Sequence, residues 1–223
     1  WVLKTYVYTF KNLRFSIDAE VIETTAGNKA LWITTDYIEA ITLKSKVLLI
    51  GLNLNNLAEA TIMELFWPGG SANSYYNTRM TTDNGVDGDF PYIYLVVSVD
   101  SITTDNKHVN AQKFAYIDNP WEVTSPNINY RSEILPVYWP NGGATETHFL
   151  YSDIAYVHIP SSLNRIIFTY SNVPDETKIW LSSCTITGAN ALFTGTIDRG
   201  TGKKIQNSAI AASGGLEIGR AHV

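Results

Sequence analysis

Residues 13–21 read Leu13-Arg14-Phe15-Ser16-Ile17-Asp18-Ala19-Glu20-Val21, so apolar and polar side chains alternate along the whole stretch. Successive side chains of a β-strand point to opposite faces of its sheet, whereas a helix would scatter the apolar residues around its circumference. The pattern therefore predicts a strand with one wet face, which is typical of an antiparallel sheet. We expect the polar residues to face water and the following residues to be buried: Leu13, Phe15, Ile17, Ala19 and Val21.

Short segments rich in strand-forming residues recur along the rest of the chain, and most are bounded by Gly, Pro, Asn or Asp, which are typical of turns. We expect strands at residues 5–10, 30–34, 47–54, 62–67, 92–102, 113–117, 134–139, 154–159, 165–170, 178–186 and 192–197. Residues 36–42 and 55–60 could each hold a helical turn, but neither has the length of an ordinary helix. Short strands separated by turns predict an all-β chain that forms sandwiches or a barrel.

Residues 118–127 are the best candidate for a domain boundary, because two prolines and several polar turn-formers interrupt the strand rhythm there. A weak internal repeat supports this division, since residues 45–63 resemble residues 164–180. We therefore expect two tandem antiparallel β-sandwiches, at residues 1–118 and 128–216, joined by a linker at 119–127. Residues 217–223 resemble the translation of a sequencing adaptor, and the fold prediction leaves them out.

The composition describes a globular, charge-poor chain with 45% hydrophobic and 17% charged residues. A net charge of −5 without any cluster of Lys and Arg argues against nucleic acid as a partner. No apolar run has the length of a membrane span. Abundant Tyr, Thr, Ile and Val are common in sandwich domains of cell and particle surfaces, so we expect an extracellular, bacterial cell-surface or virion-surface location.

Residues that could carry catalysis are scattered along the chain. No G-x-S-x-G elbow is present, and the glutamates stand singly rather than as the paired carboxylates of a glycosidase. Cys184 is the single cysteine; it lies in an alternating segment, where a buried, inert thiol is expected. The histidines lack the spacing of zinc ligands. We therefore expect a protein that is not an enzyme and that needs no cofactor.

One acidic segment could hold calcium through Asp83, Asp87 and Asp89, because hard oxygen ligands at nearby positions suit this ion. As an EF-hand loop it would place Gly85 and Tyr94 where an oxygen ligand and a bidentate glutamate belong. The favoured interpretation is a tight Gly/Asp turn that leads into the next strand. Calcium remains the weaker alternative.

Aromatic side chains in or beside turns rich in Pro, Gly and Asn are the candidate binding residues: Trp67, Tyr75, Tyr76 and Trp139. Exposed rings of this kind stack on sugars or anchor a protein partner. The favoured alternative is that Trp67 and Trp139 close the ends of their sandwiches.

Two neighbouring stretches carry a family resemblance: Ile159-Pro160-Ser161-Ser162-Leu163-Asn164-Arg165-Ile166-Ile167-Phe168 and Ser171-Asn172-Val173-Pro174-Asp175-Glu176-Thr177-Lys178-Ile179-Trp180-Leu181-Ser182-Ser183. Together they resemble the fimbrillin-type pilin and anchor proteins of Bacteroidetes. The resemblance implies tandem sandwiches of transthyretin-like or immunoglobulin-like form, export by a lipoprotein signal, and polymerisation by strand donation. No lipobox or processed donor strand is identified in the chain.

Three functions follow as hypotheses. The leading one is a structural or adhesive subunit of fimbrial type that assembles with protein subunits through strand exchange, because an open sheet edge accepts a partner strand. The charge-poor segment 5–10 is a candidate for the donated or accepting strand. The alternatives are a carbohydrate-binding surface module that takes glycans and a structural protein of a phage or viral capsid or tail.

Overall fold

The computed structural model describes residues 17–24, 26–39, 41, 44–57, 60–65, 74–83, 91–102, 108–130, 148–158, 165–173, 178–186, 192–198 and 210. Within these ranges the chain forms twelve β-strands and no helix, which confirms the all-β prediction. No helix of the described part is long and apolar enough to cross a membrane. The strands predicted at residues 5–10 and 134–139 lie outside the described residues.

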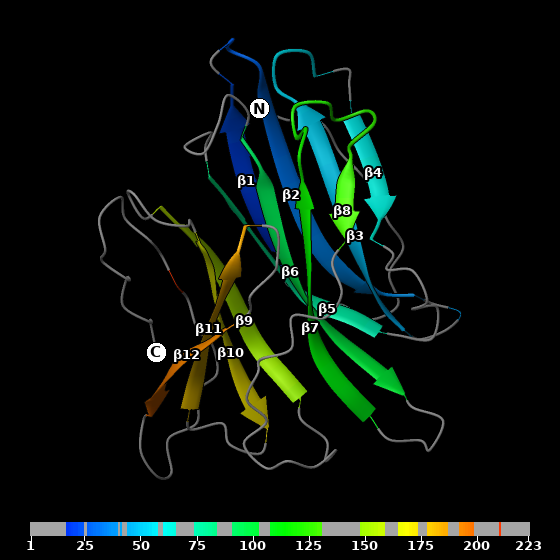
Figure 1. The fold of residues 1–223 in the computed structure, drawn as a ribbon. Helices are drawn as coiled ribbons and strands as arrows, with labels where there is room; N and C mark the ends of the chain where they lie inside the picture. The colour runs from blue at the N-terminus through cyan, green and yellow to red at the C-terminus, as the bar shows by residue number, and fades with distance from the viewer. Residues whose placement is uncertain are drawn as a thin grey trace.

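The strands form three antiparallel sheets of four strands each (Figure 1). Sheet A contains β1 (Ile17–Glu23), β2 (Lys29–Ile38), β3 (Ser45–Asn53) and β4 (Ala60–Glu64). Sheet B contains β5 (Ser74–Thr82), β6 (Ile93–Ile102), β7 (His108–Ile117) and β8 (Ile128–Tyr130). Sheet C contains β9 (His148–Val157), β10 (Arg165–Val173), β11 (Lys178–Thr185) and β12 (Leu192–Asp198). In each sheet the strands that follow one another in sequence pair with one another, so every sheet is a meander.

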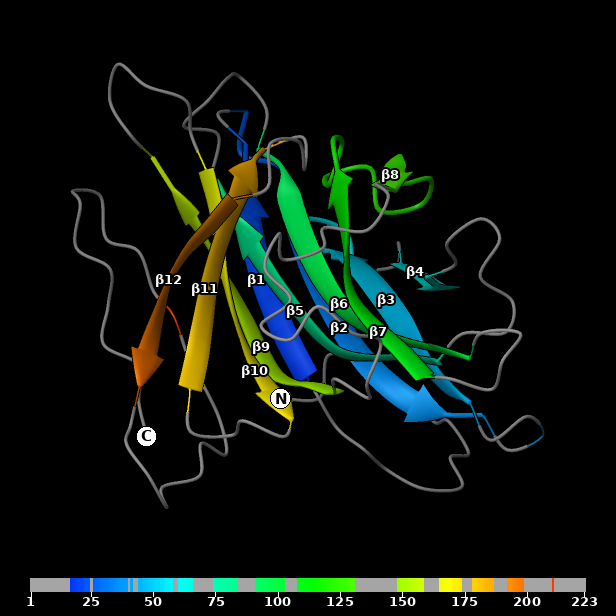
Figure 2. The same ribbon diagram turned by 60° about the horizontal axis from the view of Figure 1, so that its bottom comes forward.

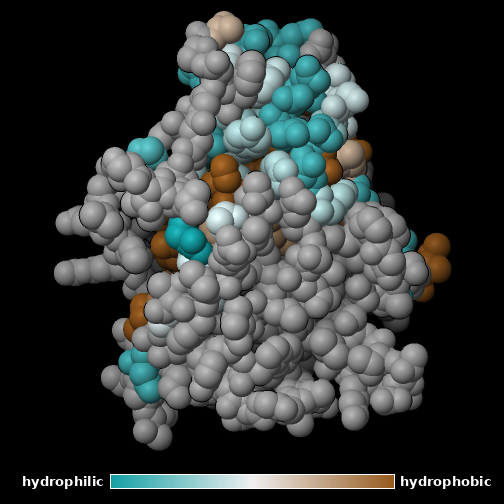
Figure 3. Space-filling view, viewed as in Figure 1, coloured by the Kyte–Doolittle hydropathy of each residue, from teal (hydrophilic) through white to brown (hydrophobic). Residues whose placement is uncertain are grey.

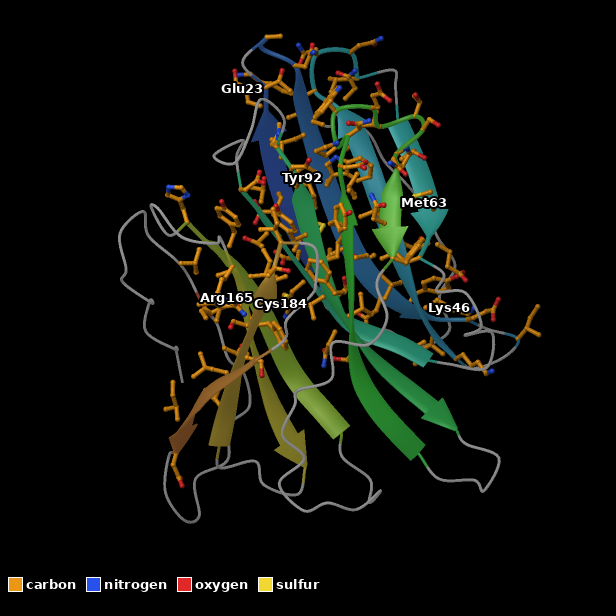
Figure 4. All side chains as sticks on the ribbon, viewed as in Figure 1. Glu23, Lys46, Met63, Tyr92, Arg165 and Cys184 are labelled. Atoms are coloured by element: carbon orange, nitrogen blue, oxygen red, sulfur yellow. The ribbon has the colours of Figure 1, made fainter. Side chains whose placement is uncertain are left out.

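Sheets A and B pack face to face as a β-sandwich. Their shared core contains Trp32 and Leu49 from sheet A and Leu95 and Ile117 from sheet B, all four fully buried. Met63 of β4 packs against this core from the side (Figure 4). Burial of these large apolar side chains stabilises the sandwich, at about 1.5–3 kcal/mol for each one removed from water.

Strand β6 is buried on both of its faces. Leu95 and Val97 enter the core with sheet A, whereas Tyr94 and Val96 enter a second core with sheet C. This second core also contains Phe168 of β10. A strand with two covered faces reads as a continuous apolar run rather than an alternating one. Sheet B is therefore the layer between sheets A and C. Figure 2 shows sheet C on the left, with the strands of sheets A and B to its right.

The predicted linker connects two strands of sheet B in the structure. Residues 118–127 join β7 to β8, and Val123 in this connection is buried in the core between sheets A and B. Glu122 N–H donates to the carbonyl of Asn119, and Ser125 N–H donates to that of Glu122, so the segment folds as consecutive turns. The division of the chain into two domains stays a prediction.

The orientation predicted for β1 is wrong. Ile17 and Val21 are exposed, at 66% and 53%, whereas Asp18 and Glu20 are half-buried. Ile22, which lies on the same face as the two acids, is fully buried in the core. Leu13 and Phe15 lie outside the described residues. The strand itself is confirmed, but its alternating pattern faces the opposite way because sheet B covers the side that carries the acids.

Strand β5 was not predicted, because its sequence lacks apolar alternation. A β-bulge interrupts it where the register shifts between Tyr76 and Arg79, and Asn77 there has a φ of 51°. Asp18 Oδ2 accepts the Met80 N–H at 2.8 Å, which ties β5 to sheet A. The Thr81 hydroxyl of β5 accepts the N–H of Tyr156 in sheet C at 3.3 Å. Strand β5 is therefore joined to both neighbouring sheets by polar contacts. Such contacts need no alternation of apolar residues in its sequence.

Candidate functional site

The outer face of sheet A, which is the face turned away from sheet B, is apolar across all four strands. The register places side chains in rows on this face, such as Ala19, Ile33, Ile50 and Ile62 on β1 to β4. None of these residues belongs to either of the two cores. We define the outer apolar face by its nine residues: Ile17, Ala19, Val21, Leu31, Ile33, Leu48, Ile50, Leu52 and Ile62.

Exposure on the outer apolar face increases from the centre towards the outer strands. Leu48 and Ile50 on β3 are 7% and 9% exposed, whereas Ile17 and Val21 on β1 are more than half exposed and Ile62 on β4 is 37% exposed. The exposed apolar side chains of this face are therefore those on its two outer strands, while its centre on β3 is covered.

An ion pair lies at each end of this face. Lys29 Nζ lies 3.1 Å from Glu23 at one end. At the other end the carboxylate of Glu64 accepts hydrogen bonds from Lys46 Nζ at 3.0 Å and from the Tyr37 hydroxyl at 2.8 Å. Figure 4 shows Glu23 and Lys46 at opposite ends of sheet A. Two lysines and two glutamates cancel, so the face has an apolar centre, a polar rim and no net charge.

The inner face of β1 carries two carboxylates instead of apolar side chains. Asp18 is held by two backbone donors, because Oδ1 accepts the Ala19 N–H at 2.9 Å and Oδ2 accepts the Met80 N–H. Glu20 stands next on the same face, and burial together with the charge of Asp18 raises the pKa of Glu20 to about 7. The ionisation of Glu20 therefore changes within the physiological pH range.

A third carboxylate, Asp153 on β9, lies near Asp18. Its Oδ2 accepts the N–H of Ile210 at 2.6 Å. Burial raises the pKa of Asp153 and nearby Asp18 adds to the rise, while backbone donors and the Arg79 guanidinium oppose it. Asp153 of sheet C thus lies near Asp18 of sheet A, which is itself bonded to Met80 of sheet B. The described residues contain no group of His, Cys, Asp and Glu side chains arranged to hold a metal ion.

Tyrosines line the boundary between sheets B and C. The rings of Tyr94 and Tyr156 are parallel, with centroids 6.0 Å apart, and Tyr92 contacts both Tyr94 and Tyr116 at centroid distances of 6.2 and 6.1 Å. Burial raises the pKa of Tyr92, and the charges of Asp118 and Asp83 raise it further. Tyr94 stacks on Tyr92 and Tyr156, and Tyr92 meets Tyr116 edge to face, so this group serves mainly to pack the two sheets together.

Asp83, the first calcium candidate, bonds to residues of sheet B and the segment before it through both carboxylate oxygens. Its Oδ1 accepts the Tyr92 N–H at 2.9 Å, and its Oδ2 accepts the Tyr94 hydroxyl at 2.8 Å. Asp83 is 2% exposed. A carboxylate with both oxygens engaged in this way anchors the start of β6. Asp87 and Asp89 lie outside the described residues, so the calcium hypothesis stays a prediction.

The aromatic binding candidates are not brought together by the described residues. Trp67 and Trp139 lie outside them. Tyr75 and Tyr76 lie in β5 rather than in a turn, and their backbones pair with Val99 and Ser98 of β6. Their roles in binding stay predictions.

Cys184 is buried in the second core, and burial raises its pKa to about 12 although the nearby Arg165 opposes the rise (Figure 4). A thiol in this state is a poor nucleophile, since only the thiolate reacts. Its burial agrees with the expectation from the sequence.

Sequence comparison finds no protein-family model and no curated protein that matches the chain.

The outer apolar face was missed because its residues on β1 were assigned to the core. A signal was present in β3, where Val47, Leu48, Leu49 and Ile50 follow one another without a polar residue. Such a run indicates a strand with two apolar faces. It predicts that both faces of β3 are covered, and Leu48 and Ile50 on the outer side are in fact only 7% and 9% exposed.

Proposed function

We propose that this chain is a non-catalytic structural or adhesive subunit of an extracellular surface, which assembles with other protein subunits by pairing exposed strand edges. The observation that supports this most is the outer edge of β1. Strand β1 ends the order of sheet A, and no described strand pairs with its other side. An edge of this kind presents a row of backbone donors and acceptors to an incoming strand.

The direction of these backbone groups follows from the first turn. The Thr24 N–H donates to the carbonyl of Asn28. Thr24 and every second residue before it therefore point their N–H groups towards β2. The N–H groups of Ala19 and Val21 therefore point away from β2. Ala19 N–H is bonded only locally, to the carboxylate of Asp18. A partner strand would meet these groups first.

The carboxylates of Asp18 and Glu20 lie on the inner face of the same edge strand. Charges on the inner face of an edge strand disfavour pairing, because a new neighbour would desolvate them. Glu20 loses its charge as the pH falls through about 7, and the desolvation cost that disfavours pairing then becomes smaller. Pairing at β1 is thus expected to be specific and to strengthen in mildly acidic solution.

The proposal is tested by light scattering and sedimentation of the whole chain over a wide concentration range. We expect oligomers whose population falls in Ala19→Pro, which removes an outward N–H without removing a ladder hydrogen bond to β2. Ala19→Val is the matched control, because it keeps the N–H and suits a strand. Circular dichroism must show that both variants fold. A chain that remains monomeric at every concentration would refute the proposal.

Glycan binding and a place in a phage or viral particle remain the alternatives. A glycan array probed with the same preparation distinguishes the first of them, because strong binding by the monomer would favour a carbohydrate-binding module. No described residue yet favours either alternative over assembly.

A further inference from the structure

We infer that the carboxylate of Asp18 is an autoinhibitory cap, which occupies an outward N–H of β1 and so holds back the pairing of a partner strand at this edge. The inference rests on the proposed function, since it names the contact that regulates pairing at that same edge. It goes further because it assigns the regulation to one hydrogen bond of one side chain, whereas the charges of the inner face act on any neighbour.

The cap is attached at two points. Oδ1 of Asp18 accepts the Ala19 N–H at 2.9 Å, and Oδ2 accepts the Met80 N–H at 2.8 Å. The first bond lies in an exposed setting and the second in a part-buried one. Met80 belongs to β5, the outer strand of sheet B, so sheet B holds the carboxylate beside the edge of sheet A.

The capped N–H is one that strand pairing needs. Ala19 points its N–H away from β2, and a strand that joins a sheet bonds to such outward groups. Ala19 is itself exposed, so a partner can reach this part of the edge. The restriction at Ala19 is therefore the hydrogen bond to Asp18.

The exchange of hydrogen-bond partners favours the cap. A bond from an N–H to a charged carboxylate is roughly twice as strong as one to a neutral carbonyl, which is what an incoming strand offers. Release of Ala19 would also leave the half-buried Asp18 with one donor fewer, and a covered carboxylate is costly without its hydrogen bonds. Pairing at β1 is thus resisted until the incoming strand supplies enough other bonds.

The neighbouring sheet shows a weaker contact of the same kind. The Thr81 hydroxyl of β5 accepts the N–H of Tyr156 at 3.3 Å, and Tyr156 lies on β9, the outer strand of sheet C. A side chain thus occupies an edge N–H there too. Natural β-proteins protect their edge strands from unwanted pairing. Asp18 differs from Thr81 because its acceptor is charged and because it covers a donor of its own strand.

Asp18→Asn is the variant that separates the cap from its anchor. An amide has one oxygen, and we expect this oxygen to stay on the part-buried Met80 N–H, where a lost bond costs more. The amide NH₂ then faces Ala19 and cannot accept its N–H. Asp18→Ala, which removes both bonds, is the second variant. Glu20→Gln is the matched control, because it removes an equal charge from the same face and neither of the two capped N–H groups bonds to Glu20.

Hydrogen exchange in dilute solution tests the cap without assembly. The Ala19 amide should lose about tenfold in protection in both Asp18 variants and keep its protection in Glu20→Gln. The Ile22 amide, which points towards β2, is the internal reference. Unchanged protection of Ala19 in both Asp18 variants would overturn the inference.

Sedimentation of the whole chains then measures the effect on assembly. We expect Asp18→Asn to lower the dissociation constant at least tenfold, or about 1.4 kcal/mol, and Glu20→Gln to lower it much less. Ala19→Pro added to Asp18→Asn should cancel the gain, because the freed N–H is then absent. A gain that is equal in Glu20→Gln, or that survives Ala19→Pro, contradicts the inference.

The results separate the cap from the proposed function. If the unchanged chain and the Asp18 variants form oligomers equally well, assembly stands and the cap does not regulate it. If the unchanged chain is monomeric and Asp18→Asn forms oligomers that Ala19→Pro abolishes, the cap stands and the proposed function of the unchanged chain fails. If all these chains are monomeric, both fail.

Discussion

The indole N–H of Trp32 on β2 donates a hydrogen bond to the carbonyl of Pro120, in the connection between β7 and β8. Both residues are buried, and the bond joins positions 88 residues apart in the chain. It attaches the predicted linker segment to sheet A, where Val123 already fills part of the core. Segment 118–127 is thereby a packed part of the sandwich between sheets A and B.

Substitution of Trp32 by Phe should lower the free energy of unfolding by about 1–3 kcal/mol, because the carbonyl of Pro120 would stay buried without its donor. Chemical denaturation measures this change. Tyr37→Phe is the control, since its hydroxyl bonds to Glu64 at the exposed rim and its loss should change stability by less than about 1 kcal/mol. Equal changes in the free energy of unfolding would show that the buried hydrogen bond stabilises the fold no more than the exposed one.

Gly51 on β3 lies opposite Trp32 in the ladder, and a Cβ at this position would be 2.7 Å from the indole ring. Gly51→Ala should therefore destabilise the fold by about 1–3 kcal/mol, the usual effect of overpacking. Gly195→Ala in β12 is the matched control, because a Cβ there would have no neighbour within 4 Å. Thermal melts of both variants check the difference, and an unchanged melt for Gly51→Ala would contradict it.

Glu20 should make the stability depend on pH near neutrality. Its pKa is raised from 4.5 to about 7 in the folded state, so folding favours the protonated form. This contribution is fully present below pH 4.5 and is lost as the pH rises through about 7. Glu20→Gln should thus raise the melting temperature relative to the unchanged chain at pH 8 and have little relative effect at pH 4.5.

Glu122→Gln, at an exposed position, is the control for this charge change. If it alters the pH profile as much as Glu20→Gln, the effect belongs to net charge rather than to the buried carboxylate.

Asp83 and Tyr94 should be energetically coupled. The Tyr94 hydroxyl donates to Asp83 at 2.8 Å in a buried setting, and hydrogen bonds to charged groups contribute about 1.5–3 kcal/mol. A double-mutant cycle with Asp83→Ala and Tyr94→Phe isolates this coupling, because the loss of the Tyr92 N–H bond is common to both Asp83→Ala variants and cancels. A coupling energy near zero would mean that the hydroxyl and the carboxylate act independently.

Cys184 should resist alkylation in the folded protein. Burial in the second core raises its pKa to about 12, and the chain contains one cysteine, so labelling reports a single site. We expect slow reaction at pH 8 and rapid reaction in denaturant, with a rate that follows opening of sheet C against sheet B. Fast labelling of the native chain would show that this part of the fold opens readily.

The sequence by itself determined the class of the fold. Alternation in residues 17–21 and apolar runs such as residues 92–97 predict strands, because a period of two is a property of the backbone that needs no partner. Turn-forming residues marked most of the connections. A buried, unreactive Cys184 also followed from its place in an alternating segment.

The tertiary structure alone decided which face of each strand is buried. Alternation states that two faces of β1 differ, but only the packing of β5 turned Asp18 inward and Ile17 outward. Likewise, the apolar run of β6 cannot reveal that sheet A covers one face and sheet C the other. Which elements meet is settled by the sum of long-range contacts, and no local pattern encodes that sum. The exposure of Ile17, Val21 and Ile62 therefore emerged only from the assembled fold. The surface seen in Figure 3 is mostly hydrophilic at the end that carries the β1–β2, β3–β4 and β7–β8 connections.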